Sequence, residues 1–215
     1  MTVKLTINSD QAGTDYLLEN KITIIRLRAN SEHLIINSLF SAFGNTNTVE
    51  YSQTYFEYAS SINTIENNQV ITLNLIKDVQ KGNVYSFTGS AINQSQRDCP
   101  SNQFALENVK QSSPDSVVCG YGEYLCINGN KQTNASNVIS LAYNTTKFFE
   151  PTTKIIIFTS QGLETNMVIP ASLLNPNQKA QCVIGNYLEV DMNQSQTIHF
   201  NSLTHQFEMG ELSSV

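Results

Sequence analysis

The chain has 215 residues and a formal net charge of −6, and only 14% of its residues are Asp, Glu, Lys or Arg. Ordinary soluble proteins carry about 25% charged residues, and here Asn, Gln, Ser and Thr take the place of the missing charge. Recognition of phosphate needs clustered basic side chains, whereas the longest basic cluster of this acidic chain is Arg26-Leu27-Arg28. The composition therefore excludes nucleic acid as a main partner and gives no polybasic segment for a membrane surface.

The N-terminal sequence MTVKLTINSD has neither the apolar core nor the small-residue cleavage site of a signal peptide. No apolar stretch approaches the length that spans a bilayer. We therefore expect a soluble protein, made in the cytoplasm without a signal peptide and without a membrane span.

The four cysteines are Cys99, Cys119, Cys126 and Cys182, and their spacing is not that of a zinc site. Without a secretion signal, we expect reduced and mostly buried thiols. A disulfide between Cys119 and Cys126, facing each other across a hairpin, is the alternative.

The first elements are predicted to be two strands. Thr2–Asn8 alternates apolar and polar residues, which is typical of a half-buried strand. Ser9–Thr14 is a turn cluster, and Lys21–Arg28 is the second strand. The apolar pattern of that strand slips at Ile24-Ile25, which indicates a bulge or burial on both faces.

The segment 31–43 is predicted to be the one short helix. Ser31 fits an N-cap, Ile35 and Leu39 share a helical face, and Gly44 stands where a left-handed C-cap is wanted. A strand is the alternative, because the pairs Ile35-Ile36 and Leu39-Phe40 also suit a sheet.

The rest of the chain is predicted to consist of strands and turns, with turn signals about every 8–12 residues. The predicted strands are Val49–Tyr58, Val70–Ile76, Val84–Ile92, Val117–Tyr121, Tyr124–Asn128, Val138–Tyr143, Lys154–Thr159, Asn166–Ile169, Gln181–Ile184, Tyr187–Met192, Gln196–Phe200 and Thr204–Met209. This pattern predicts an all-β fold: an antiparallel β-sandwich, jelly-roll-like, or a barrel. We expect one domain over 1–215, with any subdomain boundary in the weakly patterned connection 94–116.

No catalytic constellation emerges from the sequence, so we expect no enzyme. His199 and His205 lie on two strands of a predicted hairpin, where they would be either a metal or acid–base pair or two histidines at the rim of a sheet. No third ligand stands at a helpful spacing, and His33 lies far from both. Cys119 precedes a tight turn and lacks the strand-to-helix context of a nucleophile elbow, which favours a core thiol.

Loop carboxylates at Asp98, Asp115 and Glu123 have oxygen ligands of the kind that calcium takes. Their spacing does not match an ordered calcium loop. We therefore expect neither a bound metal nor a cofactor.

Tyr51, Tyr55 and Tyr58 form the candidate ligand-contact strip, with Glu50 and Glu57 in the same strand region. Aromatic rings and carboxylates on one strand are compatible with sugar binding. The interpretation that we favour is a plain sheet face whose tyrosine hydroxyls reach solvent at the rim.

The first functional hypothesis is a non-enzymatic structural protein that assembles with copies of itself or with other structural subunits, such as a virion capsid, spike or tail component. Its neutral Asn/Gln/Ser/Thr-rich β surface carries little charge to repel a second copy. A carbohydrate-binding lectin or adhesin, with glycans as partners, is the alternative. A β-pore-forming toxin is the second alternative, based on the Ser/Thr-rich segment 46–64.

Overall fold

The structure is a computed structural model, and it describes residues 2–27, 32–111, 115–174 and 186–212. Three β-sheets and a single α-helix, α1 (Gln11–Glu19), make up most of the described chain. The all-β, sandwich-like prediction is therefore confirmed. Within the described residues, no helix has the length and apolarity needed to cross a bilayer.

The largest sheet, here called the main sheet, has the strand order β10-β9-β4-β1-β16-β17, with β11 added on β9 and β5 added on β4. Its strands are β1 (Val3–Ser9), β4 (Thr46–Ala59), β5 (Leu75–Val79), β9 (Ser116–Ile127), β10 (Asn130–Ala135), β11 (Ile139–Ala142), β16 (Gln196–Asn201) and β17 (Gln206–Met209).

Two smaller sheets complete the fold. The second sheet has the order β14-β3-β2-β13-β15 and contains β2 (Lys21–Arg26), β3 (His33–Phe40), β13 (Lys154–Ser160), β14 (Val168–Pro170) and β15 (Leu188–Asp191). The upper sheet has the order β12-β8-β6-β7 and contains β6 (Asn83–Phe87), β7 (Ile92–Asp98), β8 (Phe104–Asn108) and β12 (Thr146–Phe149). A short 3-10 helix, Ala171–Leu174, follows β14.

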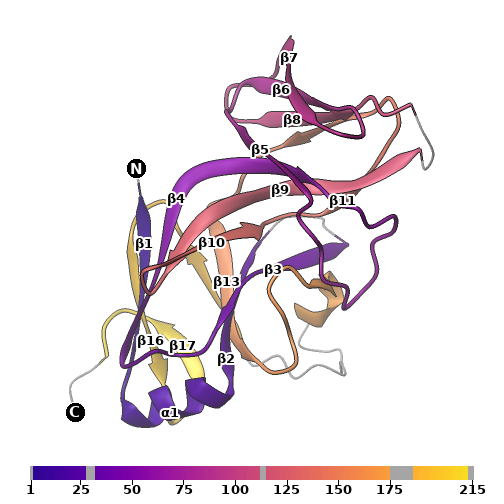
Figure 1. The fold of residues 1–215 in the computed structure, drawn as a ribbon. Helices are drawn as coiled ribbons and strands as arrows, with labels where there is room; N and C mark the ends of the chain where they lie inside the picture. Colours follow the sequence, from indigo (N-terminus) through magenta and orange to yellow (C-terminus); the bar gives the residue numbers. More distant parts are fainter. Residues whose placement is uncertain (1, 28–31, 112–114, 175–185, 213–215) are drawn as a thin grey trace.

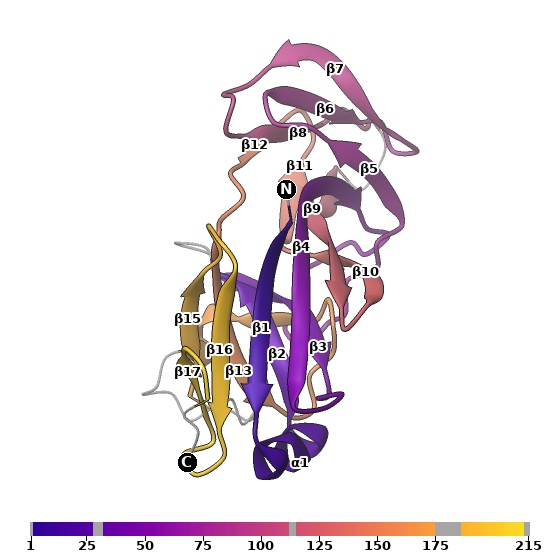
Figure 2. The same cartoon turned by 90° about the vertical axis from the view of Figure 1, so that its left-hand side faces the viewer.

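The long strands β4 and β9 connect two parts of the molecule. Figures 1 and 2 show them bending from the region of α1 up to the upper sheet. In the lower part, Leu5 of β1 packs with Ile24 and Ile157 of the second sheet. In the upper part, Tyr121 of β9 packs with Phe104 of the upper sheet. Val49 of β4 and Leu125 of β9 belong to the lower core, and Ala59 of β4 belongs with Tyr121 to the upper core, so the same two strands contribute to two hydrophobic cores.

The sheets are not purely antiparallel. Strand β1 pairs parallel with β16, and β6 pairs parallel with β8. Parallel neighbours need a crossover connection, and here the β1–β16 connection contains most of the chain. Because that crossover is not a short β–helix–β unit, local sequence patterns contain no signal for it.

The helix predicted at 31–43 is wrong, because His33–Phe40 is strand β3. Residue 31 lies outside the described residues. Leu34, Ile35 and Ile36 are all buried, since β3 has apolar neighbours on both faces. A strand buried on both faces lacks the alternating pattern and can imitate the spacing of a helix.

The actual helix, α1, occupies part of the segment that was predicted as a turn. Asp10 caps it, and its carboxylate accepts a hydrogen bond of 2.6 Å from the Gly13 backbone N–H. Gly13 looks like a turn residue in the sequence, but a Cβ there would lie 3.0 Å from the Asp10 carboxylate and 3.1 Å from the Phe200 ring. The space for a side chain is therefore limited both by the helix cap and by the packing of the helix on β16.

The hairpin predicted around Gly122-Glu123 is also wrong, because β9 runs without a turn from Ser116 to Ile127. A Cβ on Gly122 would overlap the Asn134 carbonyl oxygen and the Phe56 ring. This glycine marks close approach inside a sheet and not a turn.

The segment 94–116, predicted as a weakly patterned connection, contains most of β7 and all of β8. The predicted strand Gln181–Ile184 lies outside the described residues, as does Cys182.

Candidate functional site

A bulge in β4 lies where the lower and upper parts of the molecule meet. Tyr51 pairs with Leu125 of β9, and Tyr55 pairs with Glu123, so the three residues between the tyrosines face a single residue of β9. Gln53 in this bulge has a φ of 57°, in the left-handed region that residues other than glycine seldom adopt. Bulges and strained backbone are over-represented near functional sites, which directs attention to the side chains around this one.

A buried ion pair lies beside the bulge and joins two sheets. The Arg26 guanidinium, at the end of β2, donates from Nε to Oε1 and from Nη2 to Oε2 of Glu123, both at 2.7 Å. The side chains are 7% and 1% exposed, respectively. Burial opposes the charge of Arg26, but the facing Glu123 carboxylate raises the pKa of Arg26 above its ordinary value. As an ion pair, the two side chains together add no net charge to the site.

Neutral polar groups complete the shell of Glu123. Ser136 donates to Oε1 at 2.9 Å, and the Asn37 side-chain amide lies 3.4 Å from the same oxygen. The Asn37 amide also donates to Ser136 Oγ at 3.0 Å. A buried carboxylate is tolerated only when its lone pairs are satisfied in this way.

A narrow crevice opens over the ion pair. It is lined by Val3, Arg26, Tyr51, Gln53, Tyr55, Glu123, Thr152, Thr153 and Met192. Its cavity volume is about 20 Å³, which is room for one group of the size of a water molecule. Arg26 stacks on the Tyr51 ring, with Cζ 4.3 Å from the ring centroid. We regard this crevice as the candidate functional site.

The three tyrosines of the predicted strip point into different surroundings. Tyr51 is 2% exposed and lies in the lower core. Tyr58 is fully buried, and its hydroxyl donates to the Asn137 carbonyl at 2.7 Å. Tyr55 is partly buried against the upper core. The structure brings Tyr51 and Tyr55 to the same crevice but does not bring Tyr58 there.

The alternative of a metal or acid–base pair of histidines is wrong, because His199 and His205 are not cross-strand partners. His199 on β16 faces Glu208 across the hairpin, with Nε2 3.4 Å from the carboxylate. His205 lies before β17 and stacks on Tyr16, with ring centroids 4.1 Å apart. The described residues contain no group of three His, Cys, Asp or Glu side chains that could hold a metal ion.

The Cys119–Cys126 disulfide is wrong, because both thiols are free. The two residues lie seven positions apart on the single strand β9, so they cannot face each other across a hairpin. Cys119 is fully buried, and burial raises the pKa of its thiol. This agrees with the prediction of a core thiol.

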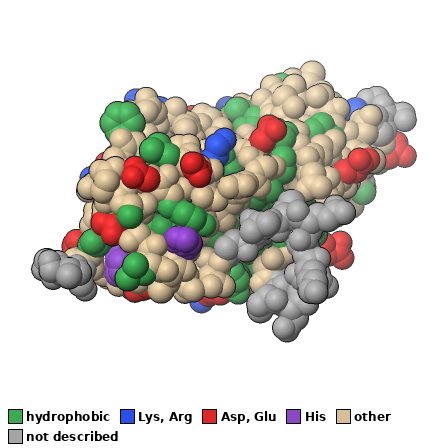
Figure 3. Space-filling view, turned by 90° about the horizontal axis from the view of Figure 1, so that it is seen from below, with side chains coloured by type: hydrophobic (Ala, Val, Ile, Leu, Met, Phe, Trp, Pro, Cys, Tyr) green, Lys and Arg blue, Asp and Glu red, His purple; other side chains and the backbone are tan. Residues whose placement is uncertain are grey.

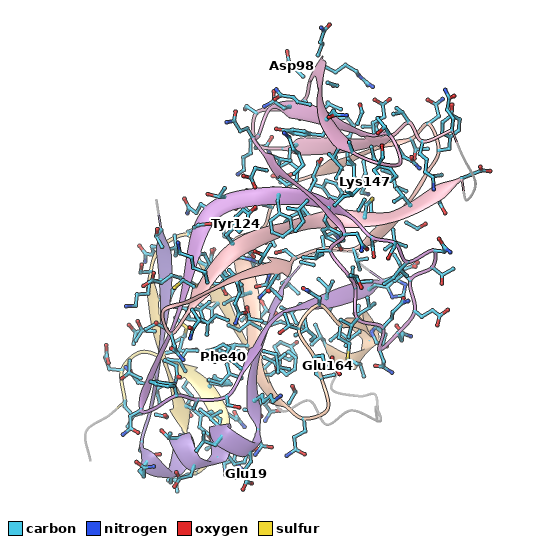
Figure 4. All side chains as sticks on the ribbon, viewed as in Figure 1. Glu19, Phe40, Asp98, Tyr124, Lys147 and Glu164 are labelled. Carbon is cyan, nitrogen blue, oxygen red and sulfur yellow. The ribbon has the colours of Figure 1, made fainter. Side chains whose placement is uncertain are left out.

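The three candidate calcium residues have separate surroundings. Glu123 is engaged by Arg26, and Asp98 lies at the outer tip of β7, as labelled in Figure 4. Asp115 precedes β9, where its backbone oxygen accepts from the Tyr143 N–H.

Arg26 and the bulge at Gln53 were missed as site residues. Arg26 was predicted to lie in a strand, which is confirmed, but its buried partner lies 97 positions away. An arginine at the end of an apolar strand and a glutamate within a Gly-Tyr-Gly-Glu run were the only signals, and neither indicates pairing.

Strand β7 is a second feature of functional interest. It is the last strand of the upper sheet, and among the described strands it pairs only with β6. Five of its seven residues are exposed, namely Asn93, Gln94, Gln96, Arg97 and Asp98. It lies at the top of the molecule in Figures 1 and 2, at the end opposite α1.

The α1 end carries apolar side chains that face solvent. Phe43 is 89% exposed, Leu203 is 93% exposed and Leu18 of α1 is 53% exposed. The loop that carries Phe43 is joined to α1 by a hydrogen bond from the Ala42 N–H to the Leu17 carbonyl. The loop that carries Leu203 is joined to the N-cap of α1 by a hydrogen bond from the Ser202 hydroxyl to the Asp10 carboxylate. Figure 3 shows this end of the molecule, with apolar patches separated by several acidic side chains.

Comparisons of the chain with protein-family models, with curated proteins and with solved structures each gave no match.

Proposed function

We propose that this chain is a non-enzymatic structural subunit of a larger assembly, such as a virion capsid, spike or tail component. The observation that carries the proposal is the free edge of β7. An unpaired strand edge presents a row of N–H and C=O groups that can pair with another strand. We propose that the occupant is the same edge of a second copy, related by a two-fold axis.

The sequence of β7 is compatible with pairing to itself. In an antiparallel pair centred on Ser95, Gln94 faces Gln96 of the second copy, and Arg97 faces Asn93. No like charges meet in this register, because Asp98 faces Ile92. Cross-strand amide pairs add hydrogen bonds between side chains.

Two further observations support assembly over the lectin alternative as the main function. Charged residues are only 14% of the chain, so repulsion between copies is weak. Phe43 and Leu203 are almost fully exposed at the end opposite β7, and exposed apolar groups often mark contact surfaces. A subunit with contact surfaces at both ends can join more than one neighbour.

The pore-forming alternative gains no specific support from the described residues. Its segment 46–64 contains β4, which lies inside the main sheet between β1 and β9. Inserting this strand in a membrane would require the central pairs of the main sheet to break.

A pair of substitutions at one exposed position tests the β7 contact. Asn93→Glu places a carboxylate opposite Arg97 of the second copy, and Asn93→Arg places like charges there. Each dimer contains this pair twice, so at ~0.5 kcal/mol per pair we expect roughly fivefold tighter and fivefold weaker dimerisation, respectively. Light scattering with size-exclusion chromatography over a wide concentration range measures both.

The two variants share one site, so any change in folding is controlled by their comparison. A wild-type chain that stays monomeric at every concentration would contradict the proposal. Equal effects of the two substitutions would contradict the register centred on Ser95.

A further inference from the structure

Tyr51, one of the residues that line the crevice above the ion pair, has a buried hydroxyl group that lacks a partner within the described ranges. Tyr51 is 2% exposed, and its Oη has no hydrogen-bond partner among the described residues. Leaving a buried hydroxyl unpaired costs about 1–3 kcal/mol. Burial raises the pKa of Tyr51, so the group is a phenol that can both donate and accept.

Arg26 has spare donors at the same place. A guanidinium has five N–H groups. Three of them are engaged, two by Glu123 and one by the Thr153 carbonyl at 3.3 Å. The remaining N–H groups have no hydrogen-bond partner in the described part of the chain. Since Glu123 cancels the charge of Arg26, the crevice offers hydrogen bonds without a net charge.

The rim of the crevice adds an amide and an aromatic ring. Gln53 is exposed and is held in its left-handed conformation by the β4 bulge. Tyr55 is partly exposed, and Lys81 Nζ lies 5.7 Å from the centroid of its ring. A polar base with an aromatic rim is suited to a ligand that has hydroxyl groups on an apolar ring.

We propose that this crevice binds a neutral carbohydrate by taking in one of its hydroxyl groups. Arg26 donates a hydrogen bond to the sugar hydroxyl oxygen, the Tyr51 oxygen accepts a hydrogen bond from the same hydroxyl, and Tyr55 packs against the sugar ring at the mouth. The small volume admits one such group and not a whole oligosaccharide. A carboxylate fits less well, because it brings a second negative charge close to Glu123. This binding is independent of the β7 contact.

Saturation-transfer difference NMR on the full chain tests the proposal. The probes are the methyl glycosides of mannose, galactose, glucose and N-acetylglucosamine, with acetate as the anionic comparison. We expect at least one glycoside to receive saturation from the protein. Tyr51→Phe should weaken that binding about tenfold, the effect of losing one good hydrogen bond.

Tyr58→Phe is the matched control, because it removes another buried tyrosine hydroxyl that lies outside the crevice. We expect this variant to bind like the wild type. Gln53→Gly serves as a second variant if Tyr51→Phe does not fold, because glycine suits the positive φ while the amide is lost. It should also weaken binding.

Three results would overturn the proposal. The first is that no glycoside receives saturation from the protein. The second is that a folded Tyr51→Phe variant binds as well as the wild type. The third is that acetate binds in preference to every glycoside. None of them bears on dimerisation through β7, which is measured separately.

Discussion

Glu57, in the upper half of β4, is a glutamate inside a hydrophobic core. Its side chain is fully buried, and neither carboxyl oxygen has a hydrogen-bond partner among the described residues. Its cross-strand neighbours are Tyr121 of β9 and Lys77 of β5. Burial raises the pKa of Glu57 well above its ordinary value of 4.5. The folded protein therefore holds this group as a neutral acid at pH values where the unfolded chain ionises it.

The raised pKa makes stability fall as the pH rises. Below pH 4.5 both states bind the proton and the group has no pH effect. Above it, only the folded state keeps the proton, and the free energy of unfolding drops by about 1.4 kcal/mol per pH unit until the folded state also ionises. Glu57→Gln should remove this loss, so that its advantage over the wild type grows between pH 4 and pH 8.

Urea unfolding at the two pH values measures the effect. The compared quantity is the change in the free energy of unfolding between pH 4 and pH 8. Any packing cost of the amide is the same at both pH values and cancels. Glu50→Gln, at an exposed position of the same strand, should leave the change as it is. An identical pH dependence in Glu57→Gln and the wild type would show that the buried carboxyl is not responsible.

The sequence pointed to some of the residues that line the candidate crevice and to none of the contacts between its polar groups, for a physical reason. Tyr51 and Tyr55 were predicted as ligand contacts because aromatic residues cluster on one strand, and both line the crevice. Their pairing with Arg26 and Glu123 depends on how β2 and β9 meet across the sandwich. No local pattern encodes a contact between residues 97 positions apart, so the polar centre of the site could not be predicted.

At the scale of elements, β4 and β9 are unusually long. They have 14 and 12 residues, whereas strands usually have about 3–10. Gly120 and Gly122 let β9 approach the segment that follows it in the chain. A Cβ on Gly120 would overlap the Asn137 carbonyl of that segment. The glycines therefore permit close approach of β9 to the backbone of Asn134 and Asn137.

Gly122→Ala should destabilise the fold by about 1–3 kcal/mol, because the new methyl group meets the Asn134 backbone and the Phe56 ring. Chemical denaturation measures this loss. Gly44→Ala is the control, because no heavy atom lies within 4 Å of a Cβ there, and its effect should be small. Equal stability of Gly122→Ala and the wild type would contradict close packing at this point.

Most strands could be predicted from the sequence, and the errors follow one rule. Alternation identified β1, because one of its faces is buried and the other is polar. Alternation failed for β3, because that strand is buried on both faces. In β9, Gly122 was wrongly predicted to form a turn. Helix α1 was missed because Gly13 was interpreted as a turn residue, whereas it lies in the helix where a Cβ would come close to Phe200. Where packing against a second layer determines the residue type, local propensity no longer predicts the secondary structure.

At the scale of the whole molecule, the Arg26–Glu123 pair fastens the second sheet to the main sheet. Removing one partner of a buried pair leaves the other charge uncompensated. Glu123→Gln should therefore lower the free energy of unfolding by about 3–5 kcal/mol. Replacing both residues, as Arg26→Met with Glu123→Leu, should recover most of the loss.

Urea denaturation of the single and double variants measures this coupling. A double variant no more stable than Glu123→Gln would mean that the site needs its polar groups for shape and not merely for charge balance. A harmless Glu123→Gln would mean that water reaches Arg26 and replaces the carboxylate.

The parallel pairing of β1 and β16 has a consequence for how the chain folds during its synthesis. Leu5 pairs with Gln196, so β1 leaves the ribosome long before β16 is made and can cover its second edge. Until then that edge stays open to other chains, and contacts so distant in sequence form slowly. The interval between synthesis of β1 and synthesis of β16 is therefore a stage at which the chain is exposed to misassociation, and its scarcity of charge gives it little electrostatic protection.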